Sequence, residues 1–551
     1  MKNLWKILSI CALAWFGAAC SDDDDASGAQ PLATGEIEVY GSLLDIRPFQ
    51  AGAELFPQHN DFVLPDGVDN LIESGLSYVT SVSDQRGPEA LRVGSNGMVY
   101  LATPSAKPAD WRETGASFVS NEVTFHVYSR FCWAGEKFEI PYDETLKTAP
   151  ILLGKKLRLA HVPAAPGVVI AKMADDGFHE RHITNVNIHI LPDGSYLALC
   201  TNGRYHRSTD IYRSTDRGAS WSMWSDTAPE MNFTRLFEHN GALYIMGSRP
   251  TGGNLLISRS DDNGKTWTIP SSKDYDDALA DLEALGEDEV AEESMKGVIM
   301  PGPCHQAPCA MIIYEGYIWR AMEVNSDPIR PYAIFAPVDS DLLDPRSWER
   351  TNIDTTTAGW DLTNGNHVSQ LIEGNMIVGP NGKLYNLLRA DCSTSSNQAC
   401  LARIVAGTDD SFKYQIKIST DSDFIVLPGG DKKFTVRYDE KSGLYWTITN
   451  PAHEKGAKHA GYYPSGVPLS LVRNKMVLCY SSDLKHWIQY KTIVENDDPW
   501  FHGFQYVDWQ FDGEDIIAVS RTAVPEERGL PVRQHDANMM TFHRVKNFRN
   551  L

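Results

Sequence analysis

An eight-residue pattern recurs along this chain and constrains its fold more than any other feature. Its two clearest copies read Ser-x-Asp-x-Gly-x-Ser/Thr-Trp, at 214–221 and 260–267, and two degenerate copies lie at 340–348 and 481–487. The Asp and Gly are typical of a tight turn between two strands, and the Ser and Asp side chains can hydrogen-bond the turn backbone. The Trp side chain is expected to pack against the sheet beneath the turn. The repeats therefore predict a series of similar antiparallel sheets.

A second repeat, from about Gly167 onward, consists of an apolar strand, a turn that contains glycine, and another apolar strand. Asp-Gly and Asn-Gly at such turns favour the positive backbone angles of type I′ hairpins. The spacing of the turns, one four-stranded unit plus insertions, favours radial repetition of the units. The six turns contain Gly194, Gly241, Gly316, Gly382, Gly443 and Gly513.

The eight-residue pattern resembles the Asp-box of the sialidase-like superfamily, which closes the outer hairpin of propeller blades. The resemblance covers roughly Gly167 to the end of the chain. It implies an all-β fold in which residues 167–551 form a six-bladed β-propeller. Seven blades are the alternative, because related polysaccharide lyases use seven. The boxes lie on the outer rim in this superfamily, so they indicate the fold and not the reaction.

Residues 36–166 lack both repeats, and we interpret them as a separate domain. The segment 121–128 alternates apolar and polar residues, as a half-buried strand does. We expect a small β-sandwich that is either carbohydrate-binding or only a spacer. Trp111 and Trp133 could stack on sugar rings, although core packing is the more common fate of a lone Trp.

The N-terminus indicates export. Two lysines precede an apolar run at 7–16, so residues 1–20 are interpreted as a secretory signal that is too short to span a membrane. The small residues before Cys20 resemble a lipobox, with Gly17 where an aliphatic residue is usual, and imply that Cys20 is lipidated. Residues 21–35 form an acidic tether. Its four aspartates resemble the export tag of Bacteroides-type surface lipoproteins; a solvated charge run is the alternative.

Net charge limits the partners of the chain. Formal charge is 50 − 72 = −22, which argues against nucleic acid and against binding to an anionic membrane through a basic face. No second apolar stretch is long enough to cross a bilayer, so the lipid would be the membrane attachment. We expect a monomeric outer-membrane lipoprotein, at the cell surface or in the periplasm, whose partner is a glycan.

Seven cysteines follow Cys20. Cys304 with Cys309 and Cys392 with Cys400 are close pairs, and we expect loop-stapling disulfides between them. A zinc site is disfavoured because further ligands at matching spacing are absent. The apolar runs around the other three predict buried thiols at Cys132, Cys200 and Cys479.

Polar residues gather near the first strand of each repeated unit, where a propeller has a shallow funnel around its axis. Burying such groups unpaired costs on the order of 1–3 kcal/mol each, so they either pair or face water. The candidates at first strands are His182, Asn185, Asn232, Thr234, Arg235, His305, Gln306, Glu373, Asn375, Lys433, His502, Gln505, Tyr506 and Asp508. Second strands and the tail add Arg320, Glu323, Arg389, Asp391, Arg521, His535, Asp536 and Asn538. Local ion pairs of Arg320 with Glu323 and of Arg389 with Asp391 are the alternative.

By resemblance to sialidases, the protein is predicted to be an exo-acting glycoside hydrolase that trims a terminal acidic sugar from complex glycans. Sialidases hold the substrate carboxylate with three arginines and use a Tyr activated by Glu as the nucleophile. The resemblance implies Tyr506 and Glu373 as the nucleophilic pair. It implies substrate contacts from Arg320, Arg389 and Arg521. Four candidates near first strands are predicted to add contacts: Asn375, Lys433, Gln505 and Asp508. The family's Arg-Ile-Pro signature is absent, so a uronate-linked substrate is supported as well as sialic acid.

Two other functions use the same residues. A polysaccharide lyase acting at a uronate needs a cation on the carboxylate and His or Tyr as base and acid, and His305, His502, Tyr506 and Arg389 would serve. A non-catalytic glycan-binding propeller needs only the polar and aromatic groups. No cofactor is implied, and no ligand spacing indicates a metal.

Overall fold

Nearly all of the regular structure is β-strand, as the repeats predict. The computed structural model describes residues 35–550 except 42–43, 57–60, 82–87, 89, 141–149, 161–163, 174–181, 203–208, 251–252, 286–290, 357, 393–396, 409, 453–468, 497–498, 500, 527–530 and 532. Within this part a single α-helix, α1 (Tyr275–Glu283), accompanies the strands. Short 3₁₀ turns are η1 (Val68–Asn70), η2 (Glu293–Met295), η3 (Pro345–Ser347) and η4 (Leu469–Leu471).

The N-terminal part contains two sheets, with strand orders β10-β1-β4-β8 and β2-β3-β9-β5-β7-β6. Their strands are β1 (Ile37–Tyr40), β2 (Leu44–Pro48), β3 (Ser77–Ser81), β4 (Ala90–Val93), β5 (Gly97–Thr103), β6 (Arg112–Ser120), β7 (Val123–Cys132), β8 (Lys137–Glu139), β9 (Ile151–Gly154) and β10 (Leu157–Leu159). Val39 and Leu91 of one sheet share an apolar core with Leu101 and Leu152 of the other. Trp111 is buried in that core, whereas Trp133 is 62% exposed.

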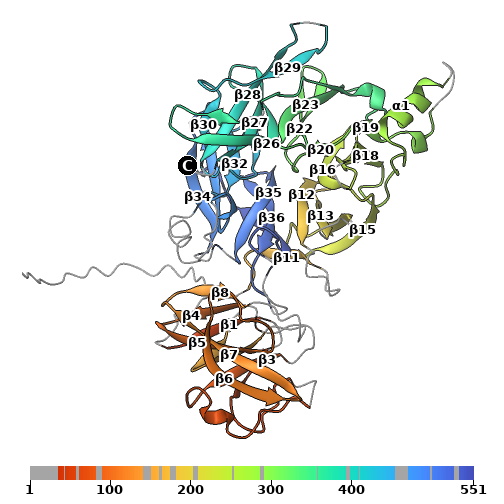
Figure 1. Cartoon of the computed structure of the whole chain (residues 1–551). Helices are drawn as coiled ribbons and strands as arrows, with labels where there is room; N and C mark the ends of the chain where they lie inside the picture. Colours follow the sequence, from red (N-terminus) through yellow and green to blue (C-terminus); the bar gives the residue numbers. More distant parts are fainter. Residues whose placement is uncertain are drawn as a thin grey trace, which may run out of the picture.

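Six further sheets follow along the chain (Figure 1). The first sheet comprises β12 (Ile183–Ile190), β13 (Tyr196–Asn202), β14 (Thr209–Ser214) and β15 (Ser222–Ala228). The second comprises β16 (Asn232–His239), β17 (Ala242–Ser248), β18 (Leu255–Ser260) and β19 (Val298–Met300). The third comprises β20 (Cys304–His305), β21 (Ile312–Tyr314), β22 (Tyr317–Val324), β23 (Arg330–Pro337) and β24 (Glu349–Arg350). The fourth and fifth comprise β25 (Trp360–Asp361), β26 (His367–Val378), β27 (Leu384–Cys392), β28 (Gln398–Ala406), β29 (Tyr414–Lys417) and β30 (Phe424–Val426); and β31 (Thr435–Asp439), β32 (Leu444–Thr449), β33 (Lys475–Ser481) and β34 (Ile488–Glu495).

The sixth sheet joins the two ends of this region. Strands β35 (Gly503–Asp512), β36 (Asp515–Ala523) and β37 (Met539–Val545) come from the end of the chain. The fourth strand, β11 (Val168–Lys172), precedes all the other sheets in sequence and pairs antiparallel with β37. The first and last strands of the region therefore lie side by side, which fixes the order of the sheets.

Hydrogen bonds from one sheet to the next close a ring around a common centre (Figure 1). Each bond uses a polar side chain on or beside an inner strand, and its partner is a backbone group of a neighbouring sheet. The first and second sheets are joined by Asn187 Nδ2, which donates to the Thr234 carbonyl, and the second and third by Arg320 Nη1, which donates to the Met246 carbonyl. The third and fourth are joined by the Gly374 amide, which donates to Glu323 Oε1, and the fourth and fifth by Asn375 Nδ2, which donates to the Phe434 carbonyl. The fifth and sixth are joined by Thr435 Oγ1, which donates to the Val507 carbonyl, and the ring closes where the Ile188 amide of the first sheet donates to Asp508 Oδ2 of the sixth.

The structure confirms the turns that the repeats predict. All six hairpin glycines have positive φ, from 63° at Gly513 to 83° at Gly194. In the pattern at 260–267, Asp262 accepts hydrogen bonds from the backbone amides of Lys265 and Thr266, and Trp267 Nε1 donates to the Gly264 carbonyl. In the pattern at 214–221, Asp216 accepts a hydrogen bond from the Ser220 amide, and Trp221 Nε1 donates to the Gly218 carbonyl. Both turns follow the third strand of their sheets, away from the inner strands.

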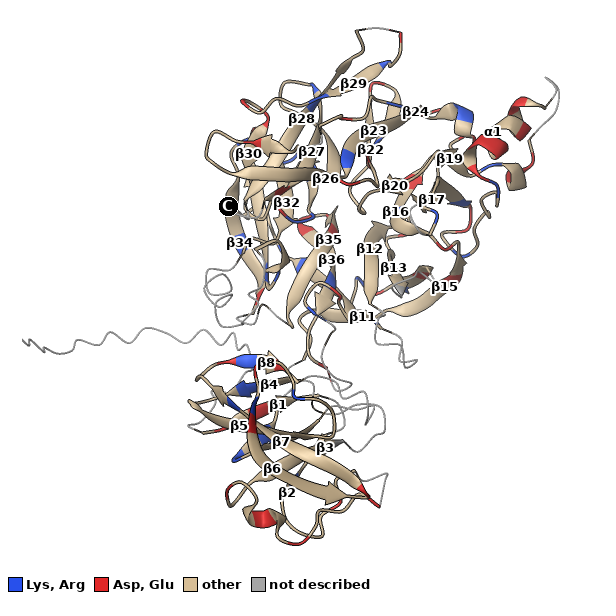
Figure 2. Cartoon of the chain, in the orientation of Figure 1, with Lys and Arg blue, Asp and Glu red and all other residues tan. Residues whose placement is uncertain are grey.

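The acidic segment 274–293 contains α1, which contacts β19, the last strand of its sheet. Figure 2 shows α1 largely in the colour of Asp and Glu, at the outer edge of the ring. The helix therefore lies at the surface and not over the centre of the ring.

The expected disulfides are absent from the described residues, and that prediction is wrong. Cys304 and Cys309 are free buried thiols, and Cys400 is also a free thiol, so it forms no bridge with Cys392. The two sulfurs of the first pair are directed at different neighbours. Cys304 Sγ lies 3.7 Å from the Tyr332 hydroxyl, whereas Cys309 Sγ lies 3.4 Å from the Glu373 carbonyl. Burial raises the pKa of Cys304 to about 11 and that of Cys309 to about 12. Cys132, Cys200 and Cys479 are buried thiols, as predicted.

The signal sequence, Cys20 and the tether up to residue 34 lie outside the described residues, so the predictions for them stay predictions. None of the helices in the described ranges has the length and apolar character needed to span a bilayer.

Candidate active site

Tyr506 occupies the centre of a cluster of cations at the inner edge of the ring. It lies in β35 at a point where the register with β36 shifts, and its φ is 53°. The guanidinium carbons of Arg473 and Arg521 lie 5.0 and 4.8 Å from the centre of its ring. Tyr506 itself is half-buried, so part of the phenol is open to solvent. Positive charge next to the ring stabilises any negative charge that develops on the phenol oxygen.

Glu373 occupies the equivalent point in β26, also at a register shift and with a φ of 55°. Its Oε2 lies 2.9 Å from Arg389 Nη1, and Arg389 also forms a 2.7 Å ion pair with Asp391. Burial raises the pKa of Glu373, but the Arg389 guanidinium outweighs burial and holds that pKa below its ordinary value. Glu373 is therefore a carboxylate at neutral pH and can accept a proton. Both Glu373 and Tyr506 act electrostatically on Arg389, which places the three groups in one neighbourhood.

A histidine and a second buried glutamate flank Glu373. His305 Nδ1 lies 3.1 Å from Glu323 Oε2, and Glu323 has no exposed surface. The other carboxylate oxygen of Glu323 accepts a hydrogen bond from the Gly374 amide, directly after Glu373. The His305 ring contacts Phe233 with 4.5 Å between ring centres. The same glutamate thus orients the imidazole and fixes the backbone at Glu373.

The C-terminal tail forms the wall next to Tyr506. The His535 ring lies 5.8 Å from the Tyr506 ring, and His535 Nδ1 lies 2.6 Å from Asp536 Oδ1. Burial, together with the nearby Arg521 cation, lowers the pKa of His535 to about 3. His535 is therefore neutral at physiological pH and donates its Nδ1 proton to Asp536. His182 Nε2 lies 3.9 Å from the same carboxylate oxygen of Asp536.

Several residues predicted to bind substrate hydrogen-bond other parts of the chain. Asn375 and Asp508 have no exposed surface, and their polar atoms bond neighbouring sheets. Lys433 Nζ donates to Thr435 and to the Val507 carbonyl. Gln505 bonds Arg473 and the backbone of the segment before β37. A role for these four residues in substrate binding stays a prediction.

Arg320 bonds the backbone of a neighbouring sheet. Its guanidinium donates to the carbonyls of Met246 and Phe233. Burial, with the nearby Arg235 cation, lowers its pKa to about 9. Of the three arginines predicted to bind substrate, Arg521 contacts the Tyr506 ring. His502 is buried just before β35.

Sequence reasoning missed two residues of this cluster. Arg473 follows Leu471 and Val472, outside the hairpin repeat, so no pattern marked it. Phe233 lies between the polar candidates Asn232 and Thr234 and was not itself a candidate. Only the register shift in β16 distinguishes it from its neighbours.

No protein-family model matches the chain, and no curated protein matches it. Among solved structures it is similar to a Hadza microbial sialidase, at 12% identity and a TM-score of 0.42, over 95% of this chain and 96% of that one. It is also similar to an α-L-arabinanase of Penicillium chrysogenum complexed with arabinobiose, at 13% identity and a TM-score of 0.40, over 71% of this chain and 100% of that one. A third is a Trypanosoma rangeli sialidase in complex with sialic acid, at 12% identity and a TM-score of 0.39, over 69% of this chain and 57% of that one.

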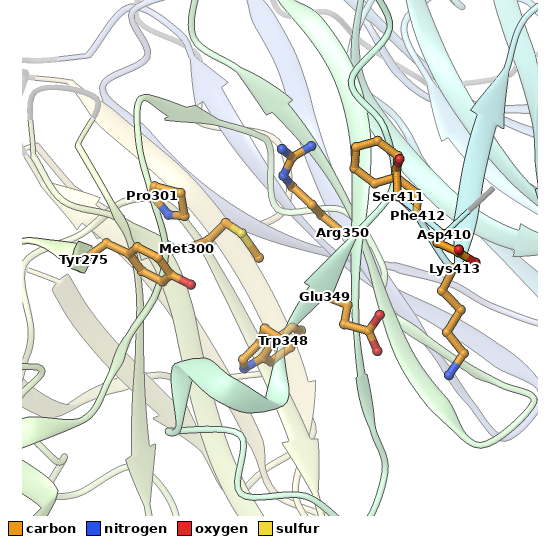
Figure 3. Close-up of a pocket in the computed structure, with 10 residues that line it drawn as sticks. All are labelled: Tyr275, Met300, Pro301, Trp348, Glu349, Arg350, Asp410, Ser411, Phe412 and Lys413. Atoms are coloured by element: carbon orange, nitrogen blue, oxygen red, sulfur yellow. The ribbon is translucent and has the colours of Figure 1, made fainter. Parts of the chain in front are cut away.

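A hollow of about 610 Å³ lies outside the ring centre (Figure 3). It is bordered by Tyr275 of α1, by Trp348 and Arg350 near β24, and by Phe412 and Lys413 before β29. It contains none of the predicted site residues. Among the described residues, no group of three or more His, Cys, Asp or Glu side chains is arranged to hold a metal ion.

Proposed function

We propose that residues 167–551 form a six-bladed β-propeller, that residues 36–166 form a β-sandwich, and that the protein is an exo-acting glycoside hydrolase. Support for the propeller comes from the closed ring of hydrogen bonds and the pairing of β11 with β37. A ring of this kind brings inner strands from distant parts of the sequence to one funnel. The lipid anchor at Cys20 and an outer-membrane location belong to the same proposal.

Tyr506 between the guanidinium groups of Arg473 and Arg521 is the observation that carries the hydrolase proposal. In this scheme Tyr506 Oη attacks the anomeric carbon and its proton passes to the Glu373 carboxylate. As the bond from the anomeric carbon to the leaving oxygen breaks, that oxygen takes a proton from solvent water. Water later hydrolyses the tyrosyl–sugar bond, its own proton passes to solvent, and Tyr506 Oη recovers its proton from Glu373. The Glu373–Arg389 pair keeps the base ionised until the proton arrives.

The substrate is proposed to be a terminal acidic sugar, because cations crowd the site. Arg389, Arg473 and Arg521 surround Tyr506, and the buried Arg521 Nε has no hydrogen-bond partner among the described residues. Guanidinium groups hold carboxylates with paired hydrogen bonds. Sialic acid and a terminal uronate both carry such a carboxylate.

The test is turnover on a panel of glycans that end in sialic, glucuronic or galacturonic acid, each with a neutral counterpart. Release of an acidic monosaccharide, with its reducing end free and no gain in ultraviolet absorbance, supports the proposal. Cleavage confined to the neutral members, or no cleavage of any member, overturns it.

A lyase is the second candidate, because the His305–Glu323 pair supplies an oriented imidazole in the same cluster. A lyase would leave an unsaturated uronide that absorbs ultraviolet light. Loss of this product in His305→Ala, with Glu373→Gln still active, would favour the lyase. A protein that binds the glycans and cleaves none would be a glycan-binding propeller.

A further inference from the structure

The innermost strand of four sheets carries the same irregularity. In β12, β16, β26 and β35, the pairing register with the next strand shifts, and one residue within the shift has a positive φ. These residues are Asn185 (53°), Phe233 (55°), Glu373 (55°) and Tyr506 (53°). A bulge of this kind turns one side chain out of the regular alternation of the strand.

Each bulge is followed, two residues later, by a polar side chain that bonds a neighbouring sheet, namely Asn187, Arg235, Asn375 and Asp508. Asn187 bonds the strand that carries Arg235, and Arg235 pairs with Asp508 at 2.7 Å. Because Asn187, Arg235 and Asp508 are connected in this way, the bulges of their three strands lie at one level of the ring. The bulge at Glu373 is near that of Phe233, because the His305 ring contacts Phe233 and its charge acts on Glu373.

Three of the four bulge residues are of types that backbone geometry does not favour there. A positive φ suits Gly and is tolerated by Asn, whereas Phe, Glu and Tyr meet steric repulsion there. A bulge needed only to bend the strand would be satisfied by Gly. Strained residues of this kind cluster at functional sites, and two of the four, Glu373 and Tyr506, are the proposed catalytic pair.

Phe233 is firmly held in this strained position. Arg320 Nη2 donates to its carbonyl at 3.3 Å, and its ring lies against His305, which Glu323 orients. Phe233 is half-buried, so part of the residue is accessible to solvent. The chain therefore fixes an aromatic ring beside His305, at the bulge level of Tyr506 and near Glu373.

We propose that Phe233 is the platform on which the sugar ring of the substrate stacks, beside the arginines that hold its carboxylate. This inference rests on the proposed function of the Glu373–Tyr506 site. An aromatic face attracts the weakly positive C–H groups on the apolar side of a sugar ring and orients the ring by its shape. Phe233 would thus determine recognition of the ring, whereas Arg389, Arg473 and Arg521 determine recognition of the charge.

Binding and stability of full-length variants test the platform separately from turnover. The probes are free sialic, glucuronic and galacturonic acid, with affinity measured by saturation-transfer NMR. Phe233→Gly removes the ring and relieves the strain, and we expect it to weaken binding of the best probe about tenfold without lowering the unfolding midpoint below that of Phe233→Leu. Phe233→Leu keeps an apolar side chain on His305 without a flat face and should also weaken binding, whereas Phe233→Tyr should retain it.

Glu315→Gly is the matched control, because Glu315 also has a positive φ, 48°, but lies exposed at a hairpin tip. It should relieve strain and leave binding unchanged. Wild-type affinity in both Phe233→Gly and Phe233→Leu would overturn the platform, and Phe233→Leu alone decides the matter if Phe233→Gly does not fold. A wild-type protein that binds a probe but cleaves no glycan overturns the hydrolase and leaves these comparisons valid. A wild-type protein that binds no probe overturns both proposals.

Discussion

Single residues at the centre of the ring owe their chemistry to neighbours from other parts of the chain. Glu373 is buried, yet its pKa is held below the ordinary value because Arg389 lies 2.9 Å away. Tyr506 is enclosed by Arg473, which comes from the segment before β33, and by Arg521 of β36. Interactions between charges are stronger in a partly buried site of this kind than in water.

Removing the proposed base or nucleophile should abolish turnover and spare binding. We expect Glu373→Gln and Tyr506→Phe each to lower kcat by on the order of 10²–10⁴, because neither variant completes the proton transfer and attack. Tyr438→Phe, an exposed tyrosine in β31, is the control. Full activity in Tyr506→Phe would contradict the nucleophilic role.

The fall of kcat/KM at acidic pH, the acidic limb of the pH profile, should reflect protonation of Glu373 in its pair with Arg389. Because the pKa of Glu373 is lowered, the carboxylate stays ionised below the ordinary Glu value of about 4.3, and kcat/KM should fall only below that pH. The pair's contribution to stability has the same sign: it is present above the unfolded pKa and lost as pH falls through the folded pKa.

Arg389→Gln removes the cation and leaves the burial, so the pKa of Glu373 should rise and the acidic limb should move to higher pH. The control is Arg403→Gln in β28, which breaks an ion pair with Asp423 and should leave the acidic limb of the kcat/KM profile where it is. The measurement is kcat/KM across acidic pH. A limb that does not move in Arg389→Gln would show that another group controls it.

At the scale of single elements, the turns that repeat along the chain are held by their own side chains. Asp262 accepts bonds from Ser260, from the amides of Lys265 and Thr266, and from the Thr266 hydroxyl. These bonds hold the pKa of Asp262 at about 2 against the effect of burial. All of them are local, which explains why an eight-residue pattern is sufficient to specify the turn.

Asp262→Ala should lower the free energy of unfolding by about 1–2 kcal/mol and leave kcat/KM unchanged, because the turn is remote from the inner strands. The neighbouring Asp261 pairs only with Arg259 at the surface, so Asp261→Ala is the matched control and should have little effect. Urea unfolding measures the difference. Equal effects of the two substitutions would contradict the structural role of Asp262.

At the scale of the whole molecule, stability depends on how the sheets are tied at the centre. Asp508 in the sixth sheet pairs with Arg235 of the second and contacts Arg437 of the fifth at 3.5 Å. It also accepts the Ile188 amide of the first sheet. One fully buried carboxylate therefore connects four sheets.

Asp508→Asn leaves Arg235 and Arg437 buried without a carboxylate, and we expect it to lower the free energy of unfolding by about 3–5 kcal/mol. Glu514→Gln breaks exposed ion pairs with Lys441 and Arg549 and should change stability little. Unfolding in urea compares the two. A change in Asp508→Asn no larger than that in Glu514→Gln would show that the central ion pairs do not hold the ring together.

The sequence by itself determined the strands, the six hairpin turns and the octapeptide turns, because each depends on neighbours within a few residues. It also indicated that polar residues gather on first strands, including Glu373 and Tyr506, and on second strands, including Arg389 and Arg521. It could not separate residues that face the centre from those that bind neighbouring sheets, since Asp508 and Tyr506 are two positions apart in one strand.

Only the tertiary structure decided that separation. A bulge turns Tyr506 toward Arg473 and Arg521, while Asp508 is paired with arginines of other sheets. Only the tertiary structure decided the state of the thiols as well. The distance between two sulfurs depends on how the strands pack and not on the spacing of the cysteines along the chain. A residue whose role depends on contacts with segments hundreds of residues away leaves no local sequence pattern, so that role can be identified only from the folded ring of sheets.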